Sequence, residues 1–159
     1  MPHTTRAHQC HHCKQWIEAG EAHDCWTTTE TALTEDLSDD LRDAWERLRE
    51  SLVEFGDQRI YASGTAIMFA RRVCYAFVRP KRSFLELIVF LGRIVRHPRV
   101  RRVDPASTTK YAHVIQVRHR DEVEPPITDW LREAYEFCEA PPHRKPRRPV
   151  RRQAAARKR

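Results

Sequence analysis

The apolar residues of this chain follow two different periods, and the period changes near residue 56. Before that point they recur at steps of three and four, which predicts one apolar stripe along a helix. The stripe consists of Leu37, Leu41, Ala44, Trp45, Leu48, Leu52 and Phe55. Ser38 is placed to cap the start of this helix, and Gly56 is placed to follow its end. Such a helix must lie on a core that the rest of the chain builds.

Beyond residue 56, short runs rich in β-branched and aromatic residues predict β-strands. Four strands are expected, at residues 65–70, 73–78, 83–91 and 111–117. The run from Phe84 to Leu91 is apolar on both faces, which fits a central strand, although a buried helix has the same pattern. Residues 92–109 are basic, contain two prolines and carry no pattern that assigns them to an element.

A second amphipathic helix is expected near the end of the periodic region. Its apolar face is formed by Ile127, Trp130, Leu131, Ala134 and Cys138. The order helix, four strands, helix predicts an α+β fold, with an antiparallel four-stranded sheet and the C-terminal helix packed on one sheet face. The residues expected to form the core are Leu41, Trp45, Leu48, Leu52, Phe69, Phe77, Ile88, Ile115, Trp130 and Leu131.

Charge and composition divide the chain into four segments. They are a zinc-finger-like segment at 1–27, a polar linker at 28–37, the α+β domain at 38–139 and an Arg/Pro-rich tail at 140–159. The tail carries nine basic residues and no acid after residue 140, so we expect it to be disordered. These residues are Arg144, Lys145, Arg147, Arg148, Arg151, Arg152, Arg157, Lys158 and Arg159. With a chain total of +7, the rest of the chain has a net charge of −2.

The cysteines and histidines of the first segment have the spacing of a zinc site. Cys10 and Cys13 form a Cys-x-x-Cys turn, and His23 and Cys25 follow after nine intervening residues. Four protein ligands of this type form a closed tetrahedron, so the sequence predicts one structural Zn²⁺ without a catalytic role. His11 and His12 are rival fourth ligands, and a disulfide between the two thiols is the alternative use of the turn.

Other candidate site residues are scattered through the domain. A ligand pocket is predicted from Thr65, Arg71, Tyr75, Lys81 and His113. Cys74 and Cys138 fall on strand and helix positions where small buried side chains are common. The chain has no glycine-rich phosphate loop, nucleophile elbow or paired carboxylate motif, so the sequence gives little support for an enzyme.

Four stretches of the domain resemble one bacterial family. They are Gly64-Thr-Ala-Ile-Met-Phe69, the segment from Arg93 through His97-Pro98 to Val103, Tyr111-Ala-His113, and Trp130-Leu-Arg-Glu-Ala-Tyr135. Together they resemble the bacterial domain of unknown function 5655 over residues 38–138. Gly64 stands where that family often has a lysine or a similar polar residue. The resemblance implies a small α+β domain, often preceded by a short zinc-finger-like segment, and it implies no activity.

Two kinds of function compete for such a chain. The first is a non-enzymatic module that binds nucleic acid non-specifically through the zinc knuckle and the basic tail. The second is a small-ligand or protein-interaction module that uses a sheet face and binds no nucleic acid. The sequence shows no apolar run of membrane-spanning length and no secretory leader, so we expect a cytoplasmic protein. It does not indicate the oligomeric state.

Overall fold

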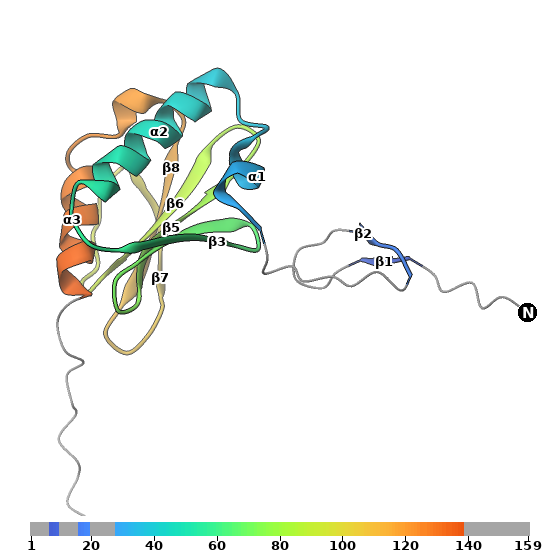
Figure 1. Ribbon diagram of the computed structural model, residues 1–159. Helices are drawn as coiled ribbons and strands as arrows, with labels where there is room; N and C mark the ends of the chain where they lie inside the picture. Colours follow the sequence, from blue (N-terminus) through green and yellow to red (C-terminus); the bar gives the residue numbers. More distant parts are fainter. Residues whose placement is uncertain (1–6, 10–15, 20–27, 139–159) are drawn as a thin grey trace, which may run out of the picture.

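The computed structural model describes residues 7–9, 16–19 and 28–138, and its architecture is α+β (Figure 1). In the N-terminal segment, β1 (His8–Gln9) and β2 (Trp16–Ile17) form an antiparallel pair. The predicted zinc ligands Cys10, Cys13, His23 and Cys25 lie outside the described residues, as does the whole tail at 140–159. The zinc knuckle and the properties of the tail therefore stay predictions.

The helix α2 (Asp39–Val53) forms where the apolar stripe predicts it. The Ser38 hydroxyl caps this helix by accepting a hydrogen bond from the Leu41 backbone N–H at 3.4 Å. Gly56 follows the helix with a φ of +128°, and a Cβ at this position would lie 2.8 Å from the Tyr135 hydroxyl oxygen. Any residue other than glycine at position 56 would therefore have a strained backbone conformation, and its Cβ would lack space.

A short helix, α1 (Glu30–Thr34), lies in the segment 28–37 that was expected to be a polar linker. The Thr29 hydroxyl caps its first turn, and Glu30 forms an ion pair with Arg49 of α2. These side-chain contacts stabilise a helix whose own sequence carries almost no apolar signal, which explains why periodicity did not reveal it.

The main sheet has six antiparallel strands, and the prediction of four was wrong. They are β3 (Arg59–Ser63), β4 (Ala66–Ala70), β5 (Cys74–Pro80), β6 (Leu85–Leu91), β7 (Val100–Pro105) and β8 (Tyr111–Val117). Their spatial order is β3-β4-β5-β6-β8-β7. The two missed strands, β3 and β7, are the two edges of the sheet. Edge strands bury fewer side chains, so their sequences show a weaker alternation than central strands do.

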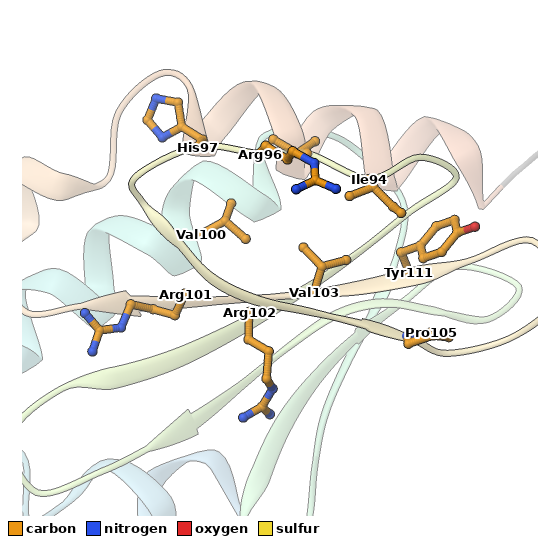
Figure 2. Close-up of a pocket in the computed structure, with 10 residues that line it drawn as sticks. Ile94, Arg96, His97, Val100, Arg101, Arg102, Val103, Pro105 and Tyr111 are labelled. Atoms are coloured by element: carbon orange, nitrogen blue, oxygen red, sulfur yellow. The ribbon is translucent and has the colours of Figure 1, made fainter.

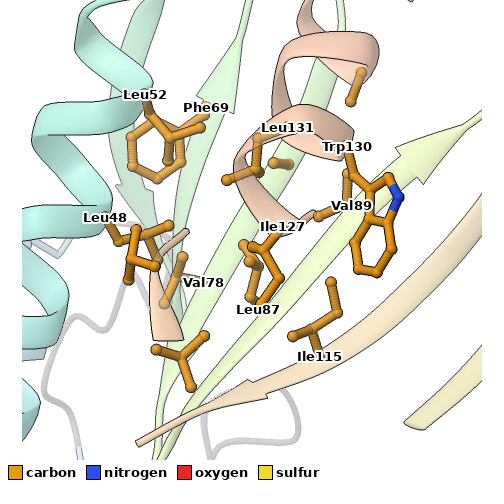
Figure 3. Close-up of a cluster of buried hydrophobic side chains, with 14 of the residues drawn as sticks. Leu48, Leu52, Phe69, Val78, Leu87, Val89, Ile115, Ile127, Trp130 and Leu131 are labelled. Atoms are coloured by element: carbon orange, nitrogen blue, oxygen red, sulfur yellow. The ribbon is translucent and has the colours of Figure 1, made fainter. Parts of the chain in front are cut away.

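Helices cover one side of this sheet. The short 3-10 helix η1 (Arg120–Glu122) follows β8, and α3 (Ile127–Phe137) closes the domain beside α2 on the same side (Figure 1). The core lies between these helices and the sheet (Figure 3). Nine of the ten predicted core residues are buried. Phe77 is half-buried, and both Phe77 and Ile88 lie on the other face of the sheet, outside the core cluster beneath the helices.

No helix among the described residues is long and apolar enough to cross a membrane.

Candidate functional site

Side chains alternate between two faces of the main sheet, and the helices pack on one of them. On β6, the side chains that join the helix-covered core are Leu85, Leu87, Val89 and Leu91. Glu86, Ile88 and Phe90 alternate with them and lie outside that core cluster. Among the described residues no helix packs on this second face, which we call the uncovered face (Figure 1).

The strand registers align one row of side chains across the uncovered face. Tyr61 is opposite Met68, Met68 opposite Phe77, Phe77 opposite Ile88, Ile88 opposite Val114, and Val114 opposite Arg102. The centre of the row is apolar and the β7 end is charged. Ile88 and Val114 are buried by their neighbours, whereas Tyr61 at the β3 edge is 41% exposed. The ring of Phe77 lies 5.9 Å from that of Phe90, so aromatic surface is continuous from β5 to β6.

Three arginines lie over aromatic rings on this face. The guanidinium carbon of Arg59 is 5.5 Å from the centre of the Tyr61 ring, two residues along β3. Arg79 is 4.9 Å from the Phe77 ring on β5. Arg118, directly after β8, is 5.6 Å from the ring of Phe84, directly before β6. These are cation–π distances. The face thus carries three arginine–aromatic pairs: Arg59 with Tyr61, Arg79 with Phe77, and Arg118 with Phe84.

The uncovered face has a modest positive charge. Its four arginines, at positions 59, 79, 102 and 118, are opposed by two acids, Glu86 and Asp104, which leaves a net of +2. Arg79 lies 3.5 Å from the Glu86 carboxylate, and Arg102 lies 2.7 Å from that of Asp104. The guanidinium of Arg118 donates to the Gln116 side-chain oxygen at 2.8 Å. These contacts therefore fix the positions of the Arg79, Arg102 and Arg118 side chains, which remain accessible to solvent.

A cavity of about 510 Å³ lies on the other side of β7, beneath the loop that joins β6 to β7 (Figure 2). Its lining consists of Ile94, Val95, Arg96, His97, Val100, Arg101, Arg102, Val103, Pro105 and Tyr111. In Figure 2, Arg96 and Ile94 of the loop face Val100 and Val103 of β7 across this space. The guanidinium groups of Arg101 and Arg102 point away from it. We call this cavity the loop pocket.

The loop over this pocket is held at its buried side by His113. The His113 side chain is only 1% exposed. Its Nε2 accepts a hydrogen bond from the Val95 backbone N–H at 3.0 Å, and its Nδ1 lies 3.1 Å from the Tyr111 carbonyl oxygen, to which it donates. This assigns the proton of the neutral ring to Nδ1. His113 therefore positions the pocket wall and does not contact the cavity itself.

Three further contacts hold the same loop from outside. Arg93 donates to the Glu133 carboxylate of α3, with a shortest distance of 2.8 Å. The His97 ring packs edge-on against Trp130 of α3, with ring centres 5.2 Å apart. Arg99 lies 3.1 Å from the carboxylate of Glu122 in η1. Because four contacts bind the loop to the domain, the pocket is pre-formed.

The structure does not gather the five residues predicted as a ligand pocket into one place. Thr65 and Lys81 are exposed in the β3–β4 and β5–β6 turns. Arg71 and Tyr75 lie at the other end of β4 and β5, where both contact Tyr135 of α3. The predicted residue nearest to a cavity is His113, through its contact with the loop.

Arg71 and Tyr75 belong to a packed cluster beneath the end of α3. The guanidinium carbon of Arg71 is 3.9 Å from the centre of the Tyr135 ring. The Tyr75 hydroxyl donates to the Gln58 side-chain oxygen at 2.5 Å, and burial raises the pKa of Tyr75 well above its usual value. With its phenol neutral and its hydroxyl engaged, Tyr75 has the properties of a core residue.

The two cysteines of the domain are also held in their neutral form. Burial raises the pKa of the Cys74 thiol to about 11, and burial likewise raises that of Cys138. A thiol becomes a nucleophile or a metal ligand as the thiolate. Among the described residues no group of three or more His, Cys, Asp or Glu side chains is placed to hold a metal ion.

Sequence reasoning missed the edge strands and therefore the candidate-site side chains that they carry. Tyr61 and Arg59 lie on β3, and Arg102 lies on β7, neither of which was predicted. The signal was present but short: Arg59, Tyr61 and Ser63 alternate with Ile60 and Ala62. An alternation of only five residues beside a helix end is hard to separate from a loop.

The family model described as "Domain of unknown function (DUF5655)" matches residues 30–138. No curated protein and no solved structure matches the chain.

Proposed function

The chain belongs to the DUF5655 family, which assigns it no activity, and we propose that it is a non-enzymatic module that binds single-stranded nucleic acid on the uncovered face. The zinc knuckle and the basic tail predicted from the sequence would add to this binding. The observation that carries the proposal is the set of three arginine–aromatic pairs on a sheet face that no described helix covers.

Aromatic rings on an open sheet suit unpaired bases. Bases of a single strand stack on aromatic side chains, and arginines beside them contact phosphates or stack in turn. Bases inside a duplex are stacked on each other and do not offer their faces. Tyr61 of β3, at 41% exposed, the half-buried Phe77 of β5 and the half-buried Phe84, which directly precedes β6, present three rings. A single strand lying across the sheet would meet these rings in succession.

Charge would orient the nucleic acid toward this face. The uncovered face has a net charge of +2, whereas residues 28–57, which include α1 and α2 on the opposite side, carry ten acids and three arginines. A polyanion is repelled from the helical side and attracted to the sheet side. The nine basic residues of the tail would contribute affinity that does not depend on sequence.

The predicted zinc site would serve this function structurally. Cys10, Cys13, His23 and Cys25 would fill all four positions of the metal with protein ligands. The Zn²⁺ would then fold the N-terminal segment, which is too short to build a core, and would leave the binding surface to protein side chains.

The test is fluorescence anisotropy of labelled 20-nucleotide strands of random sequence with the full chain. We expect single-stranded DNA or RNA to bind more tightly than the corresponding duplex at about 0.15 M salt. Tyr61→Ser removes one exposed ring and should weaken single-strand binding about 5- to 150-fold, since one stacked base contributes about 1–3 kcal/mol. Val53→Ser is the matched control, because Val53 is an apolar side chain, 44% exposed, on α2.

Two results would contradict the proposal. One is a Tyr61→Ser protein that binds single strands as tightly as the unaltered chain. The other is an equal loss of affinity in Val53→Ser, which would remove the link to the sheet face.

A further inference from the structure

The loop pocket is a second binding site, independent of the uncovered face. It lies on the opposite side of β7 and is bounded by the β6–β7 loop, so no residue of the three arginine–aromatic pairs lines it. We propose that this pocket binds a small monocarboxylate with an apolar body.

The charge directed over the pocket comes from Arg96, which has no acidic partner among the described residues. Three nearby arginines are paired with acids: Arg93 with Glu133, Arg99 with Glu122, and Arg102 with Asp104. Arg101 also lies outside these ion pairs, but its guanidinium points away from the cavity. Arg96, in the middle of the same loop, has no acidic side chain within 4.0 Å among the described residues. Figure 2 shows its guanidinium directed over the cavity. A guanidinium in this setting matches one carboxylate, which it can contact with two parallel hydrogen bonds.

The rest of the pocket is mostly apolar. Val100 and Val103 form its floor on β7, and Ile94 faces them from the loop. Ile94 is 51% exposed, which is unusual for a large apolar side chain whose loop is otherwise bound to the domain. An apolar ligand body between Ile94 and the two valines would remove this surface from water. A volume of about 510 Å³ lies within the range of small-molecule sites.

The wall that carries Arg96 is fixed before any ligand arrives. The neighbouring Val95 is anchored by the buried imidazole of His113, and the next residue, His97, packs on Trp130. The residues on both sides of Arg96 are therefore held, so binding requires little ordering of the loop. A pre-formed apolar site with one unmatched cation selects anions over neutral molecules of equal shape.

The experiment is a titration of the ¹⁵N-labelled full chain with acetate, butanoate, hexanoate and hexanamide, followed by ¹H–¹⁵N spectra. We expect the amides of residues 94–97 to shift. Affinity should rise with chain length by up to about fourfold per methylene group. Hexanamide, which has the same shape and no charge, should bind at least about tenfold more weakly than hexanoate.

Three variants assign the contacts. Arg96→Gln should weaken hexanoate binding about tenfold or more, and Arg101→Gln is the matched control because its guanidinium points away from the cavity. Ile94→Ala should weaken hexanoate more than acetate. Both arginines and Ile94 are exposed, so the same spectra will show a folded domain in each variant.

The proposal is overturned by any of three results: hexanamide binds as tightly as hexanoate, Arg101→Gln reduces binding as much as Arg96→Gln does, or the amides of residues 94–97 respond to none of the carboxylates at concentrations of about 10 mM. An equal effect of the two arginine variants would indicate a diffuse cationic surface in place of a site. Loss of nucleic-acid binding on the uncovered face would leave all of these outcomes unchanged.

Discussion

The buried ring of His113 on β8 accepts a hydrogen bond from the backbone N–H of Val95, 18 residues earlier in the chain. The contact joins a central strand to the loop that covers the cavity. The second ring nitrogen is used by the Tyr111 carbonyl, so both nitrogens of this imidazole are satisfied by backbone groups. His113 therefore joins the β6–β7 loop to β8 through hydrogen bonds.

Replacing His113 with leucine should destabilise the domain and release the loop. The change keeps an apolar body but leaves the Val95 N–H and the Tyr111 carbonyl without their partner. An unsatisfied buried group of this kind costs about 1–3 kcal/mol, which urea unfolding would measure. Hydrogen exchange at the Val95 amide should also accelerate more than exchange in α2. If the Val95 amide stays equally protected, His113 does not hold the loop.

Leu48 tests how the first long helix packs on the sheet. It is fully buried on α2, at the centre of the apolar stripe. Leu48→Ala should lower the free energy of unfolding by about 2–5 kcal/mol, because the lost side chain leaves a cavity. Val53→Ala, on the exposed side of the same helix, should cost much less. Equal losses in denaturant unfolding would mean that the helix orientation is wrong.

Cys74 should be an unreactive thiol in the folded protein. Burial raises its pKa to about 11 from an ordinary value of 9.0. At pH 8 the thiolate fraction is then about 100-fold lower than that of an exposed cysteine, and alkylation by iodoacetamide should slow in proportion. Its rate should rise as the pH increases through 11. Peptide mapping in the folded and the urea-unfolded chain measures this, and equal rates in both would contradict it.

The central part of the fold was predictable from sequence because its buried apolar side chains recur at the period of a helix or a strand. This pattern is visible in the helix ending at Val53, the strand Tyr111–Val117 and the apolar run of β6. The sheet edges bury few, so β3 and β7 were missed. Phe77 shows the second limit: its apolar character predicts burial but does not say which face of the strand it occupies.

The candidate sites were less predictable because they depend on those same edges. Tyr61 belongs to β3, and Val100 and Val103 belong to β7, so neither site could be placed before the edge strands were known. Arg96 looked like one basic residue among many in the unassigned segment 92–109. Its distinction is a guanidinium that lies over the cavity without an acidic partner, and this depends on the folded path of the loop and on which arginines the acids of α3, η1 and β7 contact.

The N-terminal segment is predicted to bind one zinc ion per chain. Elemental analysis of untagged protein should therefore give close to one equivalent of Zn²⁺. Cys13→Ser should lose most of it. His23→Gln should also lose metal, whereas His11→Gln should retain it, because residues inside a Cys-x-x-Cys turn tend to point away from the ion. A Cys13→Ser protein with a full equivalent of zinc would exclude this ligand set.

The tail should set how strongly nucleic-acid binding depends on salt, while the uncovered face should set the preference for single strands. Exchanging all nine tail arginines and lysines for glutamine in the full chain removes charge without changing its length. Each lost phosphate contact lowers the slope of log K against log salt by about 0.7 for a single strand, so the slope should fall by as much as about 6. The preference for single strands over duplex should survive, because the aromatic rings are untouched, and the melting temperature should stay the same.

Anisotropy titrations between about 0.05 and 0.3 M salt measure both the salt slope and the preference for single strands. An unchanged slope would place the phosphate contacts on the domain, and loss of the single-strand preference would place base recognition in the tail.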